Sequence, residues 1–176
     1  MLRVARGDRD ACRVLVERHL ARVVAFAGRV LGNPNEAEDV SQEAFARVWT
    51  SAATWRPGVA RFTTWLHRVV LNLCLDRIAR RREAPLDDAP EPADPAPTPA
   101  RRMEEAEVTR LVTREIEALP ERQRVALALC HYQGMRNDET AEIMGITVEV
   151  VESLLSRARR TLRERLRPFA GDLLGA

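Results

Sequence analysis

Six arginines near the end of the chain are the side chains whose type and spacing point most clearly to chemistry. They are Arg157, Arg159, Arg160, Arg163, Arg165 and Arg167. Guanidinium groups bind phosphate oxygens through paired hydrogen bonds and release the counterions that surround nucleic acid. A solvated, arginine-rich helix surface is the alternative, and the charge pattern by itself does not exclude it.

A helix-turn-helix over residues 137–167 would position these arginines on DNA. Gly145 supplies the permissive backbone of the turn, and the small side chain of Ala141 lets two helices approach closely. The second helix has apolar residues at helical spacing, which predicts one buried stripe formed by Val151, Leu154, Leu155, Ala158, Leu162 and Leu166. Recognition helices enter the major groove through their N-terminal residues, so early residues are placed for bases and later arginines for phosphates.

A second basic stripe follows the segment 61–82, which we expect to form one long helix after a loop at 56–59. Its polar side chains are Arg61, Thr64, Arg68, Asn72, Asp76 and Arg80. This mixture of positive charge and hydrogen-bonding groups suits DNA better than solvent alone. Unpaired bases stack on aromatic side chains, although helical tryptophans more often lie in a core. We place Trp49 in the core and leave both interpretations open for Trp55 and Trp65.

The helix expected near residues 36–50 carries a compact, mainly acidic patch. Glu38 and Gln42 are four residues apart, as are Asp39 and Glu43, so all four share one face. An ordinary solvated face is the simpler interpretation. In a protein that binds DNA, however, such a patch cannot face phosphate, and a basic protein surface is its natural partner.

The segment 83–102 divides the chain into two domains. It contains six prolines and almost no bulky apolar residue, so it can form neither a helix interior nor a core. Both flanking stretches have apolar residues at helical spacing and lack the alternation of strands. We therefore expect an all-α protein with small helical domains at residues 1–82 and 103–176, joined by an extended, acidic, proline-rich tether.

Composition narrows the class further. The formal net charge of +2 is nearly neutral, so the separation of acidic and basic clusters matters more than the total. Three distant cysteines offer neither a disulfide framework nor a zinc site, and Cys130 beside His131 is better explained as a buried thiol than as a metal or redox pair. We expect no metal or cofactor. No apolar run is long enough to cross a membrane and the N-terminus lacks a signal-peptide core, so we expect a cytoplasmic protein without membrane insertion.

Three segments together resemble the extracytoplasmic-function (ECF) group of bacterial RNA polymerase sigma factors, within the sigma-70 family. AEDVSQEAFARVW at 37–49 is similar to the region that docks on the polymerase clamp helices. FTTWLHRVVLNLCLDRIARRR at 62–82 is similar to the element that recognises the minus-ten promoter motif. LPERQRVALAL at 119–129, followed by the helix-turn-helix, is similar to the domain that recognises the minus-thirty-five motif.

This resemblance implies a role for each surface. Contacts to the polymerase clamp would come from Glu38, Asp39, Gln42 and Glu43. The minus-ten DNA would be lined by Trp55, Arg61, Thr64, Trp65, Arg68, Asn72, Asp76, Arg77 and Arg80. The minus-thirty-five DNA would meet Thr147, Glu149, Glu152, Ser153, Arg157 and Arg160. The loop 50–60 would accept a flipped base, and the acidic linker would run near the path of nascent RNA. The implied partners are core RNA polymerase, through its clamp helices and flap, promoter DNA and an anti-sigma factor.

The expected recognition helix departs from the family pattern. Where relatives commonly have two basic residues two places apart, this chain has Glu152 and Leu154. Glu152 weakens the attraction to phosphate, although a glutamate can accept a hydrogen bond from cytosine.

Two other function classes compete with a promoter-specificity subunit. A stand-alone helix-turn-helix regulator on palindromic sites needs a self-association helix, and none is visible. An enzyme would have to use His131 or Glu104, Glu105 and Glu107. Those glutamates suit the start of a helix, and no nucleophile and base or metal-ligand set accompanies them. We therefore expect a transcription initiation factor and not an enzyme.

Overall fold

The computed structural model describes residues 1–55, 61–83 and 100–169, with side chains described for all of these except 100–106. All regular structure in these residues is helical, which confirms the all-α expectation. The loop predicted at 56–59 and most of the linker at 83–102 lie outside the described residues.

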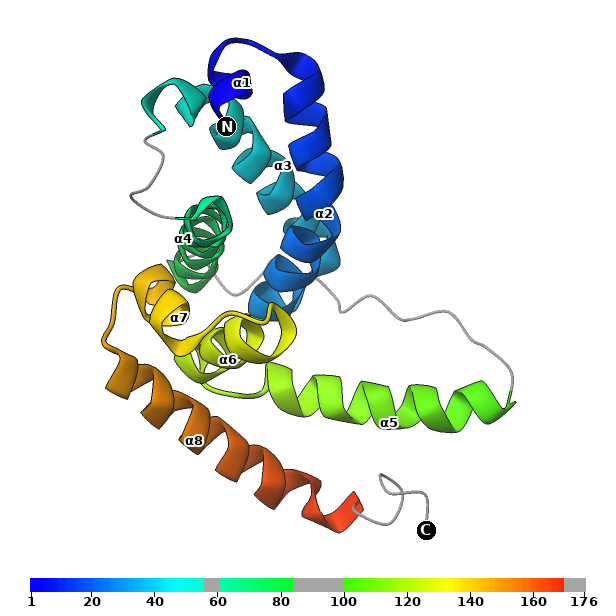
Figure 1. The fold of residues 1–176 in the computed structure, drawn as a ribbon. Coiled ribbons are helices and arrows are strands. Elements are labelled where there is room, and N and C mark those ends of the chain that lie inside the picture. The colour runs from blue at the N-terminus through cyan, green and yellow to red at the C-terminus, as the bar shows by residue number, and fades with distance from the viewer. Residues whose placement is uncertain (56–60, 84–99, 170–176) are drawn as a thin grey trace.

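The N-terminal unit contains α1 (Leu2–Ala5), α2 (Arg9–Leu31), α3 (Pro34–Ser51), a 3₁₀ turn η1 (Ala52–Thr54) and α4 (Phe62–Glu83). Asp8 begins α2, because its carboxylate accepts a hydrogen bond from the Ala11 amide. Gly32 ends that helix at φ 66°, a left-handed conformation that favours glycine. Asn33 then caps α3, with Pro34 in the first turn. The three long helices pack on one another (Figure 1).

The C-terminal unit contains α5 (Ala100–Glu117), α6 (Glu121–Leu127), a π-helical turn η3 (Ala128–Tyr132), α7 (Asn137–Met144), α8 (Val148–Leu166) and the 3₁₀ turn η4 (Arg167–Phe169). Helix α5 begins at Ala100, inside the segment predicted to be linker, and α4 includes Glu83 at its other end. The helix-turn-helix forms where the sequence predicts it. Figure 1 shows α8 running along the outer side of α6 and α5.

The two units share a hydrophobic core, which no pattern in the sequence predicts. Leu129 and Ile143 from the C-terminal unit belong to the same buried cluster as Phe26, Leu66 and Val70 from the N-terminal unit. Leu129, Phe26, Leu66 and Val70 are all fully buried. Truncating residues of this kind to alanine costs about 2–5 kcal/mol. The packing of α4 against α7 and of α2 against α6 therefore fixes how the units sit together (Figure 1).

Candidate functional site

The acidic patch lies on the exposed face of α3, as its spacing predicts. Glu38, Asp39, Gln42 and Glu43 are all exposed, while Val40 and Ala44 on the opposite face are fully buried. Two of the carboxylates already have basic neighbours. Asp39 Oδ2 lies 3.4 Å from an Arg77 guanidinium nitrogen, and Glu43 Oε1 lies 2.7 Å from one of Arg47. The patch is therefore accessible to a basic partner, although that partner would compete with these two arginines.

Trp49 belongs to the same exposed face, which corrects its predicted place in the core. Its side chain is 41% exposed. At 100° per residue it follows the line of Glu38 and Gln42 along the helix, whereas its neighbour Val48 points inward and is fully buried. An exposed tryptophan beside an acidic patch is a feature that protein interfaces favour.

The polar stripe of α4 is present, with one exception. Arg68, Asn72, Asp76 and Arg80 are exposed, and Arg77 is half-buried. Thr64 is only 2% exposed, so the expectation that its hydroxyl lies on the open stripe is wrong for this arrangement of the two units.

Carboxylates neutralise several arginines of this stripe and its ends. Arg61 lies 3.0 Å from Glu139 of α7, and Arg82 lies 3.0 Å from Glu121 of α6. Arg81 pairs with Glu36 of α3. Because Glu139 and Glu121 come from the other unit, the contact between units masks positive charge at both ends of α4.

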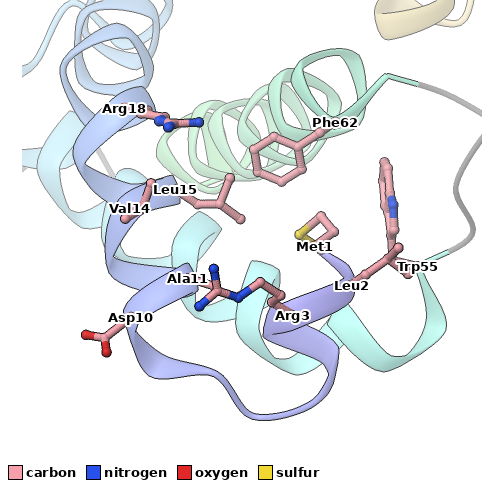
Figure 2. Close-up of a pocket in the computed structure, with 10 residues that line it drawn as sticks. All are labelled: Met1, Leu2, Arg3, Asp10, Ala11, Val14, Leu15, Arg18, Trp55 and Phe62. Atoms are coloured by element: carbon pink, nitrogen blue, oxygen red, sulfur yellow. The ribbon is translucent and has the colours of Figure 1, made fainter.

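An aromatic cluster stands where α4 begins. The rings of Trp55 and Trp65 meet edge to face at 5.5 Å between centroids, and Phe62 lies 6.1 Å from each. Trp55 and Phe62 also line a pocket of about 660 Å³ together with Met1 and Leu15. Figure 2 shows Phe62 of α4 and Trp55 facing this hollow, with Arg3 and Arg18 among its other side chains. The cluster and its pocket offer flat apolar surfaces on which a base can stack.

The helix-turn-helix turns at Gly145, where φ is 64°. The Ile146 amide donates to the Ala141 carbonyl at 3.1 Å, which completes the end of α7. Thr147 is the N-cap of α8 and is exposed. The predicted buried stripe is observed, since Val151, Leu154, Leu155 and Ala158 are buried, with Leu162 and Leu166 partly so.

The N-terminal end of α8 presents acidic side chains. Glu149 and Glu152 are exposed, and hydrogen bonding by the Thr147 side chain and by the backbone lowers the pKa of Glu149. The Asn137 amide nitrogen lies 3.5 Å from Glu152 Oε1. Ser153 is half-buried, and its hydroxyl accepts from Arg157 at 2.7 Å. Glu152 is thus oriented from α7, while Ser153 is occupied by an arginine of its own helix.

The basic part of α8 begins one turn later. Arg157, Arg159, Arg160 and Arg163 are exposed, and Arg165 lies 3.6 Å from Glu115 of α5. Several exposed basic side chains along one helix suit the phosphates that border a groove.

The three cysteines lie apart in the structure as free thiols. Cys130 Sγ lies 3.1 Å from the Thr140 hydroxyl, and burial raises the pKa of the Cys74 thiol to about 12. Across the described part of the chain, no three metal-ligating side chains gather. Glu104 and Glu105, weighed above as acidic catalysts, have side chains outside the described residues. None of the helices described here is long and apolar enough to cross a membrane.

Two helical units that each present basic side chains, together with a separate exposed acidic face, are typical of a DNA-binding protein. Residues 15–84 match the family model for Sigma-70 region 2, and residues 109–162 match that for Sigma-70, region 4. The chain is 30% identical to the RNA polymerase sigma-H factor of Pseudomonas aeruginosa, over 95% of this chain and 92% of that relative. It is 35% identical to the ECF RNA polymerase sigma factor SigE of Mycolicibacterium smegmatis, over 90% of this chain but 62% of the relative's length. The chain belongs to the ECF sigma factors of the sigma-70 family.

Solved structures show the same fold. CnrH, in a complex with the cytosolic domain of CnrY, matches with a TM-score of 0.71 at 26% identity, over 94% of both chains. The sigma factor RpoE of Bartonella quintana, in a complex with the anti-sigma factor NepR, matches with a TM-score of 0.69 at 22% identity, over 88% of this chain and 96% of that one. Both matches span the two units together.

The inter-unit contacts had no signal in the sequence. Gln133, His67 and Arg22 meet where the units join, although they are far apart along the chain and lie in no recognisable motif.

Proposed function

We propose that this chain binds core RNA polymerase, directs it to specific promoters and helps to open the minus-ten motif. The observation that supports this most is that an exposed acidic face on α3 occurs together with a basic helix in each unit. The two units follow the chain order of the matched region 2 and region 4 models. It acts through binding and has no catalytic activity of its own.

The polymerase contact consists of Glu38, Asp39, Gln42 and Glu43, extended by Trp49. The carboxylates meet basic side chains of the clamp, and the tryptophan supplies apolar area beside them. Binding of Asp39 to the clamp removes it from Arg77, its partner at 3.4 Å. Polymerase binding therefore makes an additional positive charge available on the minus-ten surface.

The minus-ten contact consists of the α4 stripe, with Arg61, Arg68, Asn72, Asp76, Arg77 and Arg80. The aromatic cluster of Trp55 and Trp65, beside the pocket in Figure 2, receives an extruded base. Capturing a base outside the stack offsets the cost of unpairing it, which is a few kcal/mol. Opening of the duplex is thus supported by binding energy alone.

The minus-thirty-five contact is made by α8. Glu149 and Glu152 face base edges, with Thr147 and Ser153 beside them, and Arg157 and Arg160 bind phosphates. Because Glu152 replaces a basic residue, we expect this chain to favour a cytosine amino group at one position. The flap of the polymerase is the protein partner of this unit.

We also propose where the chain works, what holds it inactive and where its linker lies. The chain works in the cytoplasm, an anti-sigma factor holds it inactive, and the acidic linker at 83–102 follows the path of nascent RNA. NepR bound to RpoE in the solved relative supports the second of these.

Reconstitution tests the whole proposal. Purified chain and core polymerase are incubated with fragmented genomic DNA, and transcript starts are mapped by sequencing. We expect starts that share motifs near minus ten and minus thirty-five, and none from core polymerase alone. Sequence-specific binding to palindromes by the chain without polymerase, with no change in start sites, would instead establish a stand-alone regulator.

A further inference from the structure

We infer that the free chain closes on itself, and that the buried side chain of Gln133 holds the C-terminal unit on the N-terminal unit in a state that cannot engage both promoter motifs at once. This inference rests on the proposed function for the meaning of the closed state. The closed state itself rests on the contacts that join the units.

Gln133 makes polar contacts with two helices of the other unit. It is 6% exposed. Its main-chain carbonyl accepts from the Arg22 guanidinium at 3.3 Å, and its side-chain amide donates to the Arg22 carbonyl at 3.3 Å. Its Oε1 lies 3.4 Å from Nε2 of His67, which is 3% exposed. One residue therefore joins α2, α4 and the segment after η3, and separating the units would leave these polar groups to be solvated again.

Apolar and aromatic contacts surround Gln133. Leu129, one turn earlier, is fully buried in the core that includes Phe26 and Leu66. The Arg29 guanidinium lies 4.0 Å from the centre of the Tyr132 ring. Arg124 donates to the Val30 carbonyl at 2.9 Å. The contact has a desolvated centre and a polar rim, which is the anatomy of a specific interface.

The closed state conflicts with simultaneous recognition of both promoter motifs. As their names indicate, the motifs lie about 25 base pairs apart, which is about 85 Å of duplex at 3.4 Å per base pair. In the closed state α4 packs against α7, and Arg61, just before α4, lies 3.0 Å from Glu139 of α7. Helix α8 has 19 residues and therefore spans about 28 Å. The units must separate before α4 and α8 can occupy their motifs together.

The solved relative CnrH supports the same arrangement, since it matches over 94% of both chains while bound to another protein. A self-closed form would present both units already in this arrangement to such a partner. Core polymerase and promoter DNA would then have to open it, so that closure lowers the fraction of chains competent to bind.

Energy transfer between two dyes tests the inference on the full chain. Azide-bearing residues replace the exposed Glu17 of α2 and Glu164 of α8, which leaves the native cysteines untouched. The free chain should show high transfer, and a complex with core polymerase and promoter should show low transfer. Gln133→Ala should raise the ratio of open to closed chains about tenfold, as expected for losing hydrogen bonds worth about 1.4 kcal/mol.

Matched variants keep the test decisive. His131→Ala removes an exposed side chain two residues away and should leave the ratio unchanged. Arg22→Ala, at an exposed position, should open the chain in the same direction and replaces Gln133→Ala if circular dichroism shows that variant to be unfolded. Low transfer in the free wild-type chain, or an unchanged ratio in folded variants at both positions, would overturn the inference. Mapping of transcript starts with the same proteins is scored separately, so a failure of the proposed function would appear there and not in the dye distances.

Discussion

The arginines of α4 and the arginines of α8 differ in what holds them. On α4, Arg77, Arg81 and Arg82 lie within ion-pair distance of carboxylates, as does Arg61 just before the helix, and two of these carboxylates belong to the other unit. On α8, by contrast, Arg159, Arg160 and Arg163 have no carboxylate at ion-pair distance among the described side chains. A DNA-binding surface can thus be built in two ways. Its arginines are either unpaired in the free protein, or paired with carboxylates until a partner separates them. The comparison predicts that α8 meets duplex DNA in the free chain, and that α4 contributes only after polymerase binds and the units separate.

The largest expected effect comes from preventing the binding of core polymerase, which we propose frees the arginines of α4 from their carboxylates. Asp39→Arg with Glu43→Arg reverses two exposed charges on α3, and like charges across an interface cost several kcal/mol. Affinity for core polymerase in a titration should therefore fall at least about a hundredfold.

Asp10→Arg with Glu17→Arg is the matched control, because it reverses two exposed carboxylates of α2 that pair with Arg13. Its affinity should stay near that of the wild type, since exposed pairs contribute about 0–1 kcal/mol. Equal losses in the two variants would show that net charge, and not the patch, governs the interaction.

A second, smaller effect separates the arginines themselves. In the free chain, Arg160→Ala should weaken binding to duplex DNA and reduce the slope of log affinity against log salt by about one unit. Arg77→Ala should change neither, because this guanidinium is already 3.4 Å from Asp39. The measurement is a salt series by fluorescence anisotropy. A slope that falls equally in both variants would remove the distinction between the helices.

Glu152→Ala sharpens the comparison within α8. The change should alter which base is preferred at one minus-thirty-five position, with overall affinity unchanged or slightly higher because a charge repelled by phosphate has gone. Selection from a randomised duplex library measures this preference. If the selected sequences match those of the wild type, Glu152 does not face the bases.

The smallest effect concerns His67 at the junction of the units. Burial, with a contribution from Arg22, lowers the pKa of His67 below its ordinary value. The folded chain therefore binds fewer protons than the unfolded chain. The contribution of His67 to the free energy of unfolding is fully present above about pH 6.5 and decreases as the pH falls below it. Between pH 7.5 and 5.5 we expect Tm to fall by about 2–4 °C.

His67→Gln provides the comparison, because burial lowers the pKa of His19 in the same direction and contributes to the wild-type trend. The variant should show a weaker pH dependence of Tm than the wild type. An identical pH dependence would mean that His67 does not titrate differently in the folded chain.

The sequence predicted local features well, because their causes are local. Gly145 and the apolar stripe from Val151 to Ala158 determine the helix-turn-helix, and helical spacing alone brings Glu38 and Gln42 together. Trp49 was misplaced because a tryptophan next to a buried valine was assigned to the same face, although 100° separates them.

Long-range contacts could not be predicted in the same way. Thr64 is buried in a structure where α4 packs against α7, and no pattern within α4 indicates this. A proline-rich linker predicts separation of the units along the chain but carries no information about attraction between them. Gln133 has the composition of any polar loop residue, and only its position opposite Arg22 and His67 gives it a role.

Transcription from two templates tests most directly the claim that α4 acts on opened promoter DNA and α8 on duplex. One template is fully paired, and the other is already unpaired at the minus-ten motif. Asn72→Ala and Arg80→Ala should reduce transcript from the paired template about tenfold or more and from the opened template much less, since capture of unstacked bases is then no longer limiting. Arg160→Ala should reduce both equally. Equal defects of the α4 variants on both templates would contradict the account and would leave α4 with phosphate anchoring alone.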